Sequence, residues 1–254
     1  MILDSVLKEV IKDYIEKELP EVVEREIKVP LEIPIKRVIS LIGPRRAGKT
    51  YFMFQLMKSV DSSLRLYLNF EDYRLTGITS KEFFRLIEIY YSLFPENKKR
   101  KVYFFFDEIQ NVNEWEKVVR HLLDNENCQI FITGSSSKLL SKEIATQLRG
   151  RSLTYFVFPF SFREFLKVKK INFSEVFSSY ERFKIIKLLE DYLKIGGYPE
   201  VIIFNNKEKI IDEIWEVTIS RDIIERWKVK NIKALRLLIK AIKESSKFSV
   251  HKYY

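Results

Sequence analysis

The chain has 254 residues, and 46% of them are hydrophobic. That length can bury the core of one large domain or of two small ones. One cysteine, Cys128, excludes a disulfide framework within the chain, and one cysteine with two histidines cannot build a zinc cluster. No apolar run approaches the ~20 residues that cross a bilayer, and the N-terminus carries charges too early for a signal peptide. We therefore expect a cytoplasmic protein with no membrane contact.

The formal net charge is +10, and its distribution along the chain is uneven. Residues 1–36 hold 6 basic and 9 acidic side chains, whereas residues 226–254 hold 9 basic side chains and one acid, Glu244. A basic block of this kind can bind nucleic-acid phosphates. The alternative is a lysine-rich helix face in solvent. Nucleic acid is therefore a candidate partner of the C-terminal segment.

The hydrophobic pattern predicts alternating helices and strands. Helices are expected over residues 5–18, 49–60, 80–94 and 114–123, and strands over residues 37–42, 64–70, 102–106, 129–133 and 155–158. Ser80 is the expected N-cap of its helix. This alternation predicts an α/β fold in which helices flank a parallel sheet. From residue 162 the pattern is helical almost to the end, which indicates a separate small helical domain.

Four segments are expected from these patterns. They are an N-terminal helical segment over 1–36, a nucleotide-binding core over 37–160, a helical lid over 161–230 and a basic segment over 231–254 that could open a winged helix. The last residues, KFSVHKYY, resemble the start of another helix. We therefore expect either a truncated protein or a short one with a frayed end.

Residues Gly43–Thr50 read GPRRAGKT, which matches the P-loop pattern G-x-x-x-x-G-K-[ST] without a gap. In such a loop the backbone N–H groups cradle phosphate oxygens, and the helix N-terminus adds positive potential. Lys49 should reach the β- and γ-phosphates of ATP, and Thr50 should ligand Mg²⁺. The residues expected to bind the nucleotide are Gly43, Pro44, Arg45, Arg46, Ala47, Gly48, Lys49, Thr50 and Tyr51.

Residues 102–108 read VYFFFDE, an apolar strand that ends in two carboxylates. This is the Walker B pattern. Asp107 at the strand end can hold Mg²⁺, and Glu108 can polarise the attacking water as a general base. The alternative for an isolated Asp-Glu pair is a surface turn.

The strand IFIT ends in the small polar residues of GSSS. A sensor side chain at this position would contact the γ-phosphate or the attacking water. Thr133, Ser135 and Ser136 are the candidates, and Ser135 is the preferred catalytic residue. The alternative is an ordinary serine-rich loop.

Two later motifs are candidates for further contacts to the nucleotide. QLRGR contains Arg149 and Arg151, and a permanently charged arginine suits stabilisation of phosphate in the transition state. A structural salt bridge is the alternative for these arginines. IGGYP, which ends in Pro199, could bring a rigid break of the backbone against the nucleotide, or it could be an interhelical turn.

These motifs follow one another in the order GPRRAGKT, FFFDEIQ, ITGSSS, LRGR, PFSFREF, GGYPE and SRDII. In this order the chain resembles the prokaryotic, archaeal-type AAA+/STAND-like P-loop ATPases that carry an uncharacterised C-terminal domain. The resemblance implies that Glu108 is the catalytic glutamate, that Arg151 is an arginine finger and that Pro199 touches nucleotide from the lid. A second sensor arginine of the lid is not evident, and Arg221 is the candidate.

The leading interpretation is an ATP-hydrolysing, Mg²⁺-dependent molecular switch that forms a homo-oligomer. A rival is a regulatory or DNA-binding adaptor that binds nucleotide with negligible hydrolysis, for which Glu108 would be unnecessary. A small-molecule or nucleotide kinase is disfavoured, because the expected lid arginines and substrate pocket are not evident in the sequence.

Overall fold

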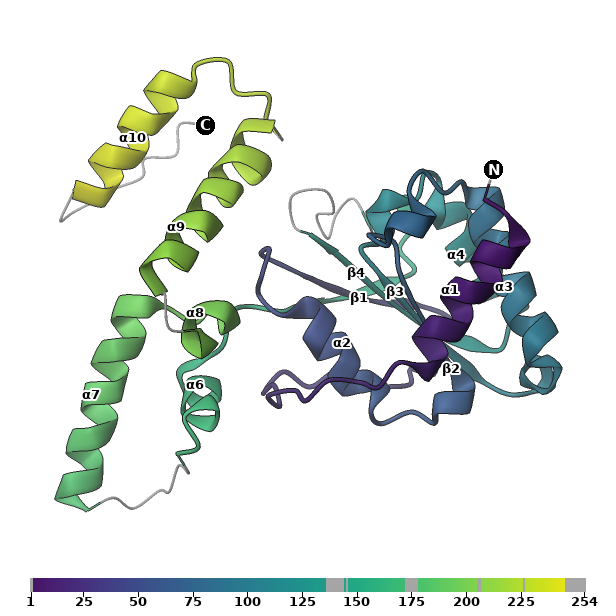
Figure 1. Cartoon of the computed structure of the whole chain (residues 1–254), viewed down its shortest axis with the longest axis horizontal. Helices are drawn as coiled ribbons and strands as arrows, with labels where there is room; N and C mark the ends of the chain where they lie inside the picture. The colour runs from purple at the N-terminus through teal and green to yellow at the C-terminus, as the bar shows by residue number, and fades with distance from the viewer. Residues whose placement is uncertain are drawn as a thin grey trace.

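The computed structural model describes residues 2–135, 144, 146–171, 178–204, 207–225 and 227–244. An α/β core, which holds the N-terminus, stands beside a group of helices that forms the C-terminal part of the described chain (Figure 1). The two parts meet at the start of α2 (Lys49–Met57) and at α8 (Pro199–Ile203). Of the described helices, none is both long enough and apolar enough to cross a membrane.

The core is built on five parallel strands in the order β2-β3-β4-β1-β5. Their bounds are β1 Val38–Gly43, β2 Arg65–Asn69, β3 Val102–Asp107, β4 Cys128–Ser135 and β5 Ser152–Phe156. Because all of these strands run parallel, the carboxyl ends of β1 and β3 lie at the same edge of the sheet, with β4 between them. The predicted α/β class with a parallel sheet and flanking helices is confirmed.

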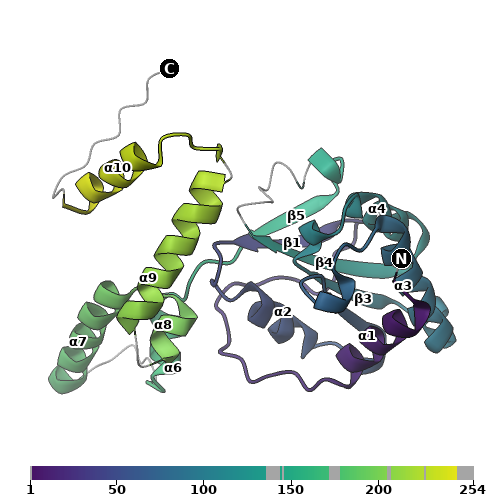
Figure 2. The same cartoon turned by 45° about the horizontal axis from the view of Figure 1, so that its top comes forward.

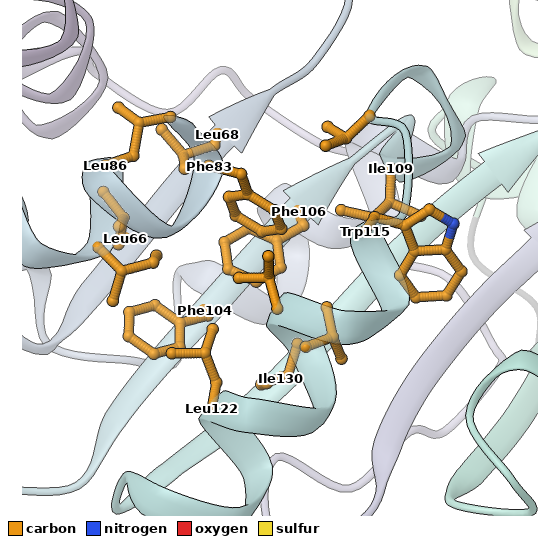
Figure 3. Packing of buried hydrophobic residues seen from close by; sticks show 14 of the residues in the cluster. Leu66, Leu68, Phe83, Leu86, Phe104, Phe106, Ile109, Trp115, Leu122 and Ile130 are labelled. Carbon is orange, nitrogen blue, oxygen red and sulfur yellow. The ribbon is translucent and has the colours of Figure 1, made fainter. Parts of the chain in front are cut away.

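Helices cover both faces of the sheet. They are α1 Asp4–Glu16, α2 Lys49–Met57, α3 Ser80–Leu93 and α4 Trp115–Asn125, with short 3₁₀ turns at Ser62–Leu64, Tyr73–Leu75, Pro95–Lys99 and Ile109–Asn111. Strand β3 contributes buried side chains to both faces of the sheet. Phe104 and Phe106 pack with α3 and α4 on one face (Figure 3), whereas Phe105 packs with α2 on the other. All three rings are fully buried, which explains why this strand reads as a continuous apolar run.

The N-terminal segment is half helix and packs as part of the core. Leu7, Val10 and Ile11 of α1 are buried in the same cluster as α3 and β2. Residues 17–37 contain no helix; they run in extended form past α2 and contribute partly buried side chains, among them Val22 and Ile27, to the second face of the sheet.

A group of helices, here called the lid after the sequence expectation, follows the core. Its elements are α6 Phe162–Val168, α7 Ser179–Ile195, α8 Pro199–Ile203, α9 Lys207–Val217 and the π-helical segment η5 Thr218–Glu225. Helix α10 Ile232–Glu244 lies in the basic segment that the sequence places after the lid. The lid's own small hydrophobic cluster includes Phe160, Phe165, Leu166 and Ile202. Both views place α10 at the far end of α9, away from α6 and α7 (Figures 1 and 2).

Two details of the sequence prediction need correction. Thr79, not Ser80, caps α3, because its side chain accepts a hydrogen bond from the Glu82 N–H while the Glu82 side chain accepts one from the Thr79 N–H. Strand β5 starts three residues before the predicted strand and ends two residues earlier than it, at Phe156. The polar start of this strand, Ser152, is held by a hydrogen bond between its hydroxyl and that of Ser40 in β1, a tertiary contact that hydrophobic periodicity does not report.

Candidate nucleotide site

The loop between β1 and α2 is shaped by its two glycines. Gly48 has φ +89°, a left-handed conformation that glycine adopts without steric cost. Gly43 lies so close to the neighbouring chain that a β-carbon there would be 2.0 Å from the carbonyl oxygen of Val157. Arg46 also adopts a positive φ, of 60°. The loop therefore leaves β1, folds back over the strand end and delivers Lys49 and Thr50 as the first residues of α2.

Lys49 is a buried cation at the centre of this loop. Its Nζ donates hydrogen bonds to the carbonyl oxygens of Gly43, at 3.2 Å, and Pro44, at 3.0 Å. Burial lowers the pKa of Lys49, and the nearby carboxylates of Glu108 and Asp107 oppose that shift. An ammonium held by two neutral carbonyls retains donor capacity for phosphate oxygens, as the P-loop pattern predicts.

Asp107 is held at the end of β3 by three hydroxyl groups. Thr50 Oγ1 donates to its Oδ2 at 2.8 Å, the Tyr67 hydroxyl donates to the same oxygen at 2.9 Å, and Thr133 Oγ1 donates to Oδ1. Burial raises the pKa of Asp107, although the hydrogen bonds from Thr133 and Thr50 act in the opposite direction. Thr50 and Asp107, the two predicted magnesium ligands, are thus in direct contact.

Glu108 follows Asp107 in a left-handed conformation, with φ 51°. Its backbone N–H donates to Thr133 Oγ1 at 2.9 Å, and its carboxylate accepts a hydrogen bond from Gln110 Nε2. The turn at Glu108 points the carboxylate away from the buried strand, and Glu108 lines the same cavity as Lys49 and Thr50. Two adjacent carboxylates therefore have different surroundings: Asp107 faces the hydroxyl groups, and Glu108 faces the cavity.

That cavity has a volume of about 540 Å³ and lies between the P-loop and the lid. Its lining residues are Arg45, Arg46, Gly48, Lys49, Thr50, Tyr51, Glu71, Glu108, Pro199, Glu200, Val217 and Arg221. A second cavity of about 630 Å³ lies beside it and shares Arg46, Gly48, Tyr51, Pro199 and Glu200 with the first. Most of the predicted nucleotide-binding residues are thus gathered around one space, and Arg221, the candidate lid arginine, is among them.

The predicted sensor and finger residues are placed differently by the structure. Thr133 is fully buried behind Asp107 and does not line either cavity. Ser135 ends β4, but its side chain lies outside the described residues, as does the whole of Ser136. Arg151 precedes β5 and pairs with Asp124 at 2.5 Å. Its carbonyl accepts from the N–H of Val38 at the start of β1, so Arg151 lies at the opposite edge of the sheet from the P-loop of its own chain.

Arg25 is a residue of the site that the sequence analysis missed. Its buried guanidinium donates to the carbonyl of Ala47 in the P-loop at 3.1 Å, to the carbonyl of Phe158 at 2.5 Å and to Glu164 Oε1 in α6 at 2.9 Å. The guanidinium also stacks over the Phe160 ring, 4.9 Å from its centroid. Arg25 lies among exposed acidic residues in an extended segment, so neither periodicity nor a motif distinguishes it.

The two P-loop arginines pair with carboxylates of the lid. Arg45 Nε lies 3.4 Å from Asp222 Oδ1 in η5, and Arg46 Nη1 lies 3.1 Å from Glu200 in α8 and 3.8 Å from Glu213 in α9. These lid acids were also absent from the sequence prediction, because they belong to three separate elements that only the fold brings to the loop. Both arginines of the P-loop therefore lie beside acidic side chains of the lid.

The phosphate-cradling loop, the acidic strand end and the strand order define the P-loop class of nucleotide-binding proteins. A family model described as an AAA domain matches residues 35–166, more than half of the chain. The chain belongs to this AAA domain family, and its site is a nucleotide-binding site of the P-loop NTPase type.

Three similar proteins put the chain in context. It is 42% identical over 237 residues to the uncharacterized protein MJ1544 of Methanocaldococcus jannaschii, and this match covers 92% of this chain and 52% of that protein. It is 36% identical over 211 residues to an uncharacterized protein of Haemophilus influenzae, covering 80% of this chain and 50% of that protein. The chain thus spans about half the length of these curated relatives. The solved structure of C. elegans PCH-2 aligns with a TM-score of 0.36 and 13% identity over 96% of this chain and 62% of that one, a likeness too weak to carry an argument.

Proposed function

We propose that this protein is a Mg²⁺-dependent ATPase that acts as a molecular switch, in which hydrolysis at the core changes the position of the lid. The observation that carries the proposal is the meeting of Lys49, the Thr50–Asp107 pair and Glu108 at one edge of the sheet, beside a cavity that the lid closes. These groups supply a phosphate cation, a metal-binding pair and a base, which are the parts that phosphoryl transfer to water requires.

The donor set at this edge suits magnesium. Mg²⁺ is held by one or two protein oxygens together with substrate phosphates and water, and Thr50 and Asp107 provide two oxygens 2.8 Å apart. No group of three or more His, Cys, Asp or Glu side chains that could hold a metal occurs among the described residues, so a metal cage made of protein ligands alone is not the arrangement that these residues favour. When bound, Mg²⁺ would supply positive charge to the β- and γ-phosphate oxygens.

The second cavity suits the base of the nucleotide. Its apolar lining comes from the extended N-terminal segment (Val23), α2 (Phe52) and the lid side (Phe160, Ile203 and Phe204). An aromatic base is bound mainly by such apolar and aromatic surfaces. Because Gly48 and Tyr51 line both cavities, a nucleotide can extend from the second cavity, past the P-loop, to Glu108.

In this arrangement each residue has one task. The P-loop and Lys49 bind the phosphates, Asp107 and Thr50 position the metal-binding oxygens, and Glu108 accepts a proton from, or orients, the attacking water. The rival adaptor function needs only phosphate binding and metal positioning, not the activation of water. The carboxylate of Glu108, aimed into the cavity by a strained turn, favours hydrolysis.

Two substitutions test the proposal. Lys49→Ala should abolish detectable ATP binding in isothermal titration while the protein stays folded by circular dichroism, because charge-assisted bonds to phosphate are strong. Unchanged affinity in the folded variant would refute the placement of ATP at the P-loop.

Glu108→Gln should bind ATP·Mg²⁺ with near wild-type affinity but release phosphate at least about a hundredfold more slowly, the usual effect of removing a general base. Release is measured without any added acceptor, so that a kinase would score as inactive. A wild type that binds ATP and releases no phosphate would favour the adaptor instead.

A further inference from the structure

The contact between the P-loop and the lid shows an unusual complementarity of charge. Two consecutive loop residues, Arg45 and Arg46, face three carboxylates, which are Glu200, Glu213 and Asp222. The pairs of Arg46 are largely exposed, with 34% of its side chain and 44% and 54% of its partners' side chains accessible, so water screens them. The pair of Arg45 and Asp222 is more enclosed, with 23% and 14% of the side chains exposed.

The Arg45–Asp222 pair is close but poorly bonded. Within the part of the chain that the structure describes, Arg45 Nε and Asp222 Oδ1 are both buried atoms that lack a hydrogen-bond partner, although they lie 3.4 Å apart. Burying charged groups is costly unless hydrogen bonds satisfy them. The pair is therefore an incomplete interaction that a better partner for Arg45 would replace.

The position of Arg45 indicates what that partner is. Arg45 lines the cavity that contains Lys49, Thr50 and Glu108, and it does not line the second, apolar cavity. It is therefore on the side where the reacting phosphate would lie. A terminal phosphate offers several charged oxygens, which match the fork of N–H donors on a guanidinium better than a single carboxylate oxygen at 3.4 Å does.

We propose that Asp222 is a lid-side positioning residue that competes with the terminal phosphate of ATP for Arg45. The proposal rests on the function proposed above. When Arg45 turns to the γ-phosphate, Asp222 loses its cation and η5 is released from the P-loop; when the phosphate leaves as product, Arg45 returns to Asp222 and the lid closes again. ADP, which lacks the terminal phosphate, leaves the pair intact.

The surrounding contacts restrict where the lid can move. Arg25 binds both the P-loop and Glu164 of α6 with well-formed hydrogen bonds, so α6 stays attached to the core. Asp222 lies at the other end of the lid, in a π-helical segment, a distortion that frequently accompanies functional sites. The α6 end is therefore the pivot, and η5 is the part that moves.

Asp222→Asn tests this exchange because it removes the charge and keeps the shape of the side chain. The variant should bind a non-hydrolysable ATP analogue with Mg²⁺ about two- to fivefold more tightly than the wild type, the effect expected when one partly screened ion pair is removed. Its affinity for ADP should not change. The gain should vanish in an Arg45→Gln background, because the two residues act through each other. Asp191→Asn, an exposed lid aspartate on α7, is the matched control and should bind both nucleotides like the wild type.

The position of the lid provides a second readout. Spin labels at Lys99 in the core and at the exposed Asp212 in α9, the helix that contacts η5, in a Cys128→Ser background, should show that the analogue but not ADP changes the core-to-lid distance in a protein with otherwise wild-type sequence. In Asp222→Asn the changed distance should be present without nucleotide. If Asp222→Asn binds the analogue and ADP as the wild type does and its lid distance is unchanged, the exchange is refuted while nucleotide binding stands. If the wild type binds neither nucleotide, both this proposal and the proposed function fail.

Discussion

At the scale of single residues, the site depends on hydroxyl groups as much as on charges. Asp107 receives three hydroxyl donors, from Thr50, Tyr67 and Thr133. Thr133 has a further contact, since its oxygen accepts the N–H of Glu108. One threonine therefore connects Asp107, the proposed metal-binding carboxylate, to the backbone that aims the proposed base, and it does so without lining either cavity.

Thr133→Val should separate this positioning role from binding. Valine keeps the volume in the core but removes the donor to Asp107 and the acceptor for the Glu108 N–H, so we expect phosphate release to slow by about 10- to 100-fold, the usual effect of losing an outer-shell partner. ATP affinity should change little, because Lys49 is untouched. Thr154→Val, at a half-buried position of β5 outside the site, is the control. Wild-type turnover in Thr133→Val would show that the hydroxyl of Thr133 has no role.

At the scale of elements, the sequence specified the sheet and the loops that follow its strands, because strong local signals coincide there. The apolar run that ends in Asp107 and the P-loop pattern ending at Thr50 predicted two strand ends, and a parallel sheet brings such ends to one edge. The lid contacts could not be predicted this way. Asp222 and Arg25 are charged residues in polar surroundings, and only the path of the chain between distant elements brings them to the loop.

The contact of Arg25 with α6 is a prediction about stability at this scale. Arg25→Met should lower the free energy of unfolding by about 3–5 kcal/mol, because it leaves the buried carboxylate of Glu164 without its cation. Urea denaturation measures the loss. Adding Glu164→Met should recover part of it, since a buried pair costs less to replace than to break. Arg163→Met, at a largely exposed position beside α6's buried face, should cost less than about 1 kcal/mol. If Arg25→Met also lowered the free energy of unfolding by less than about 1 kcal/mol, other contacts would join the core to α6.

At the scale of the whole molecule, the position of Arg151 bears on assembly. It lies before β5, at the amino end of the sheet, and at roughly 3.3 Å per residue the five-residue strand puts it ~16 Å from the P-loop edge of its own chain. It cannot serve its own site from there. Action on a neighbouring subunit, as the family resemblance implies, stays a prediction, as does nucleic-acid binding by residues 226–254, where α10 is a described helix and the last ten residues lie outside the description.

Mixing experiments test whether Arg151 acts in trans. Arg151→Ala, inactive alone, should regain phosphate release when mixed with inactive Glu108→Gln, because some interfaces then pair an intact Glu108 with an intact Arg151. An arginine finger contributes about 10³–10⁵ in rate, so wild-type specific activity should also rise with protein concentration. Asp124→Asn breaks the ion pair of Arg151 but keeps the arginine. If Asp124→Asn loses as much activity as Arg151→Ala, and mixing restores nothing, Arg151 is a structural residue.

The left-handed turn at Glu108 has a consequence for how such a protein can change over time. A glutamate with φ 51° is in a conformation that costs about 1 kcal/mol or more, whereas glycine accepts it freely and asparagine accepts it readily. Substitution by either would relax the backbone at the end of β3 and raise the melting temperature, but it would remove the carboxylate from the cavity. Under the proposed function, selection for stability and selection for turnover act in opposite directions at this position. A lineage that no longer needed hydrolysis would be expected to exchange the glutamate for a residue that adopts this backbone conformation at a lower energetic cost.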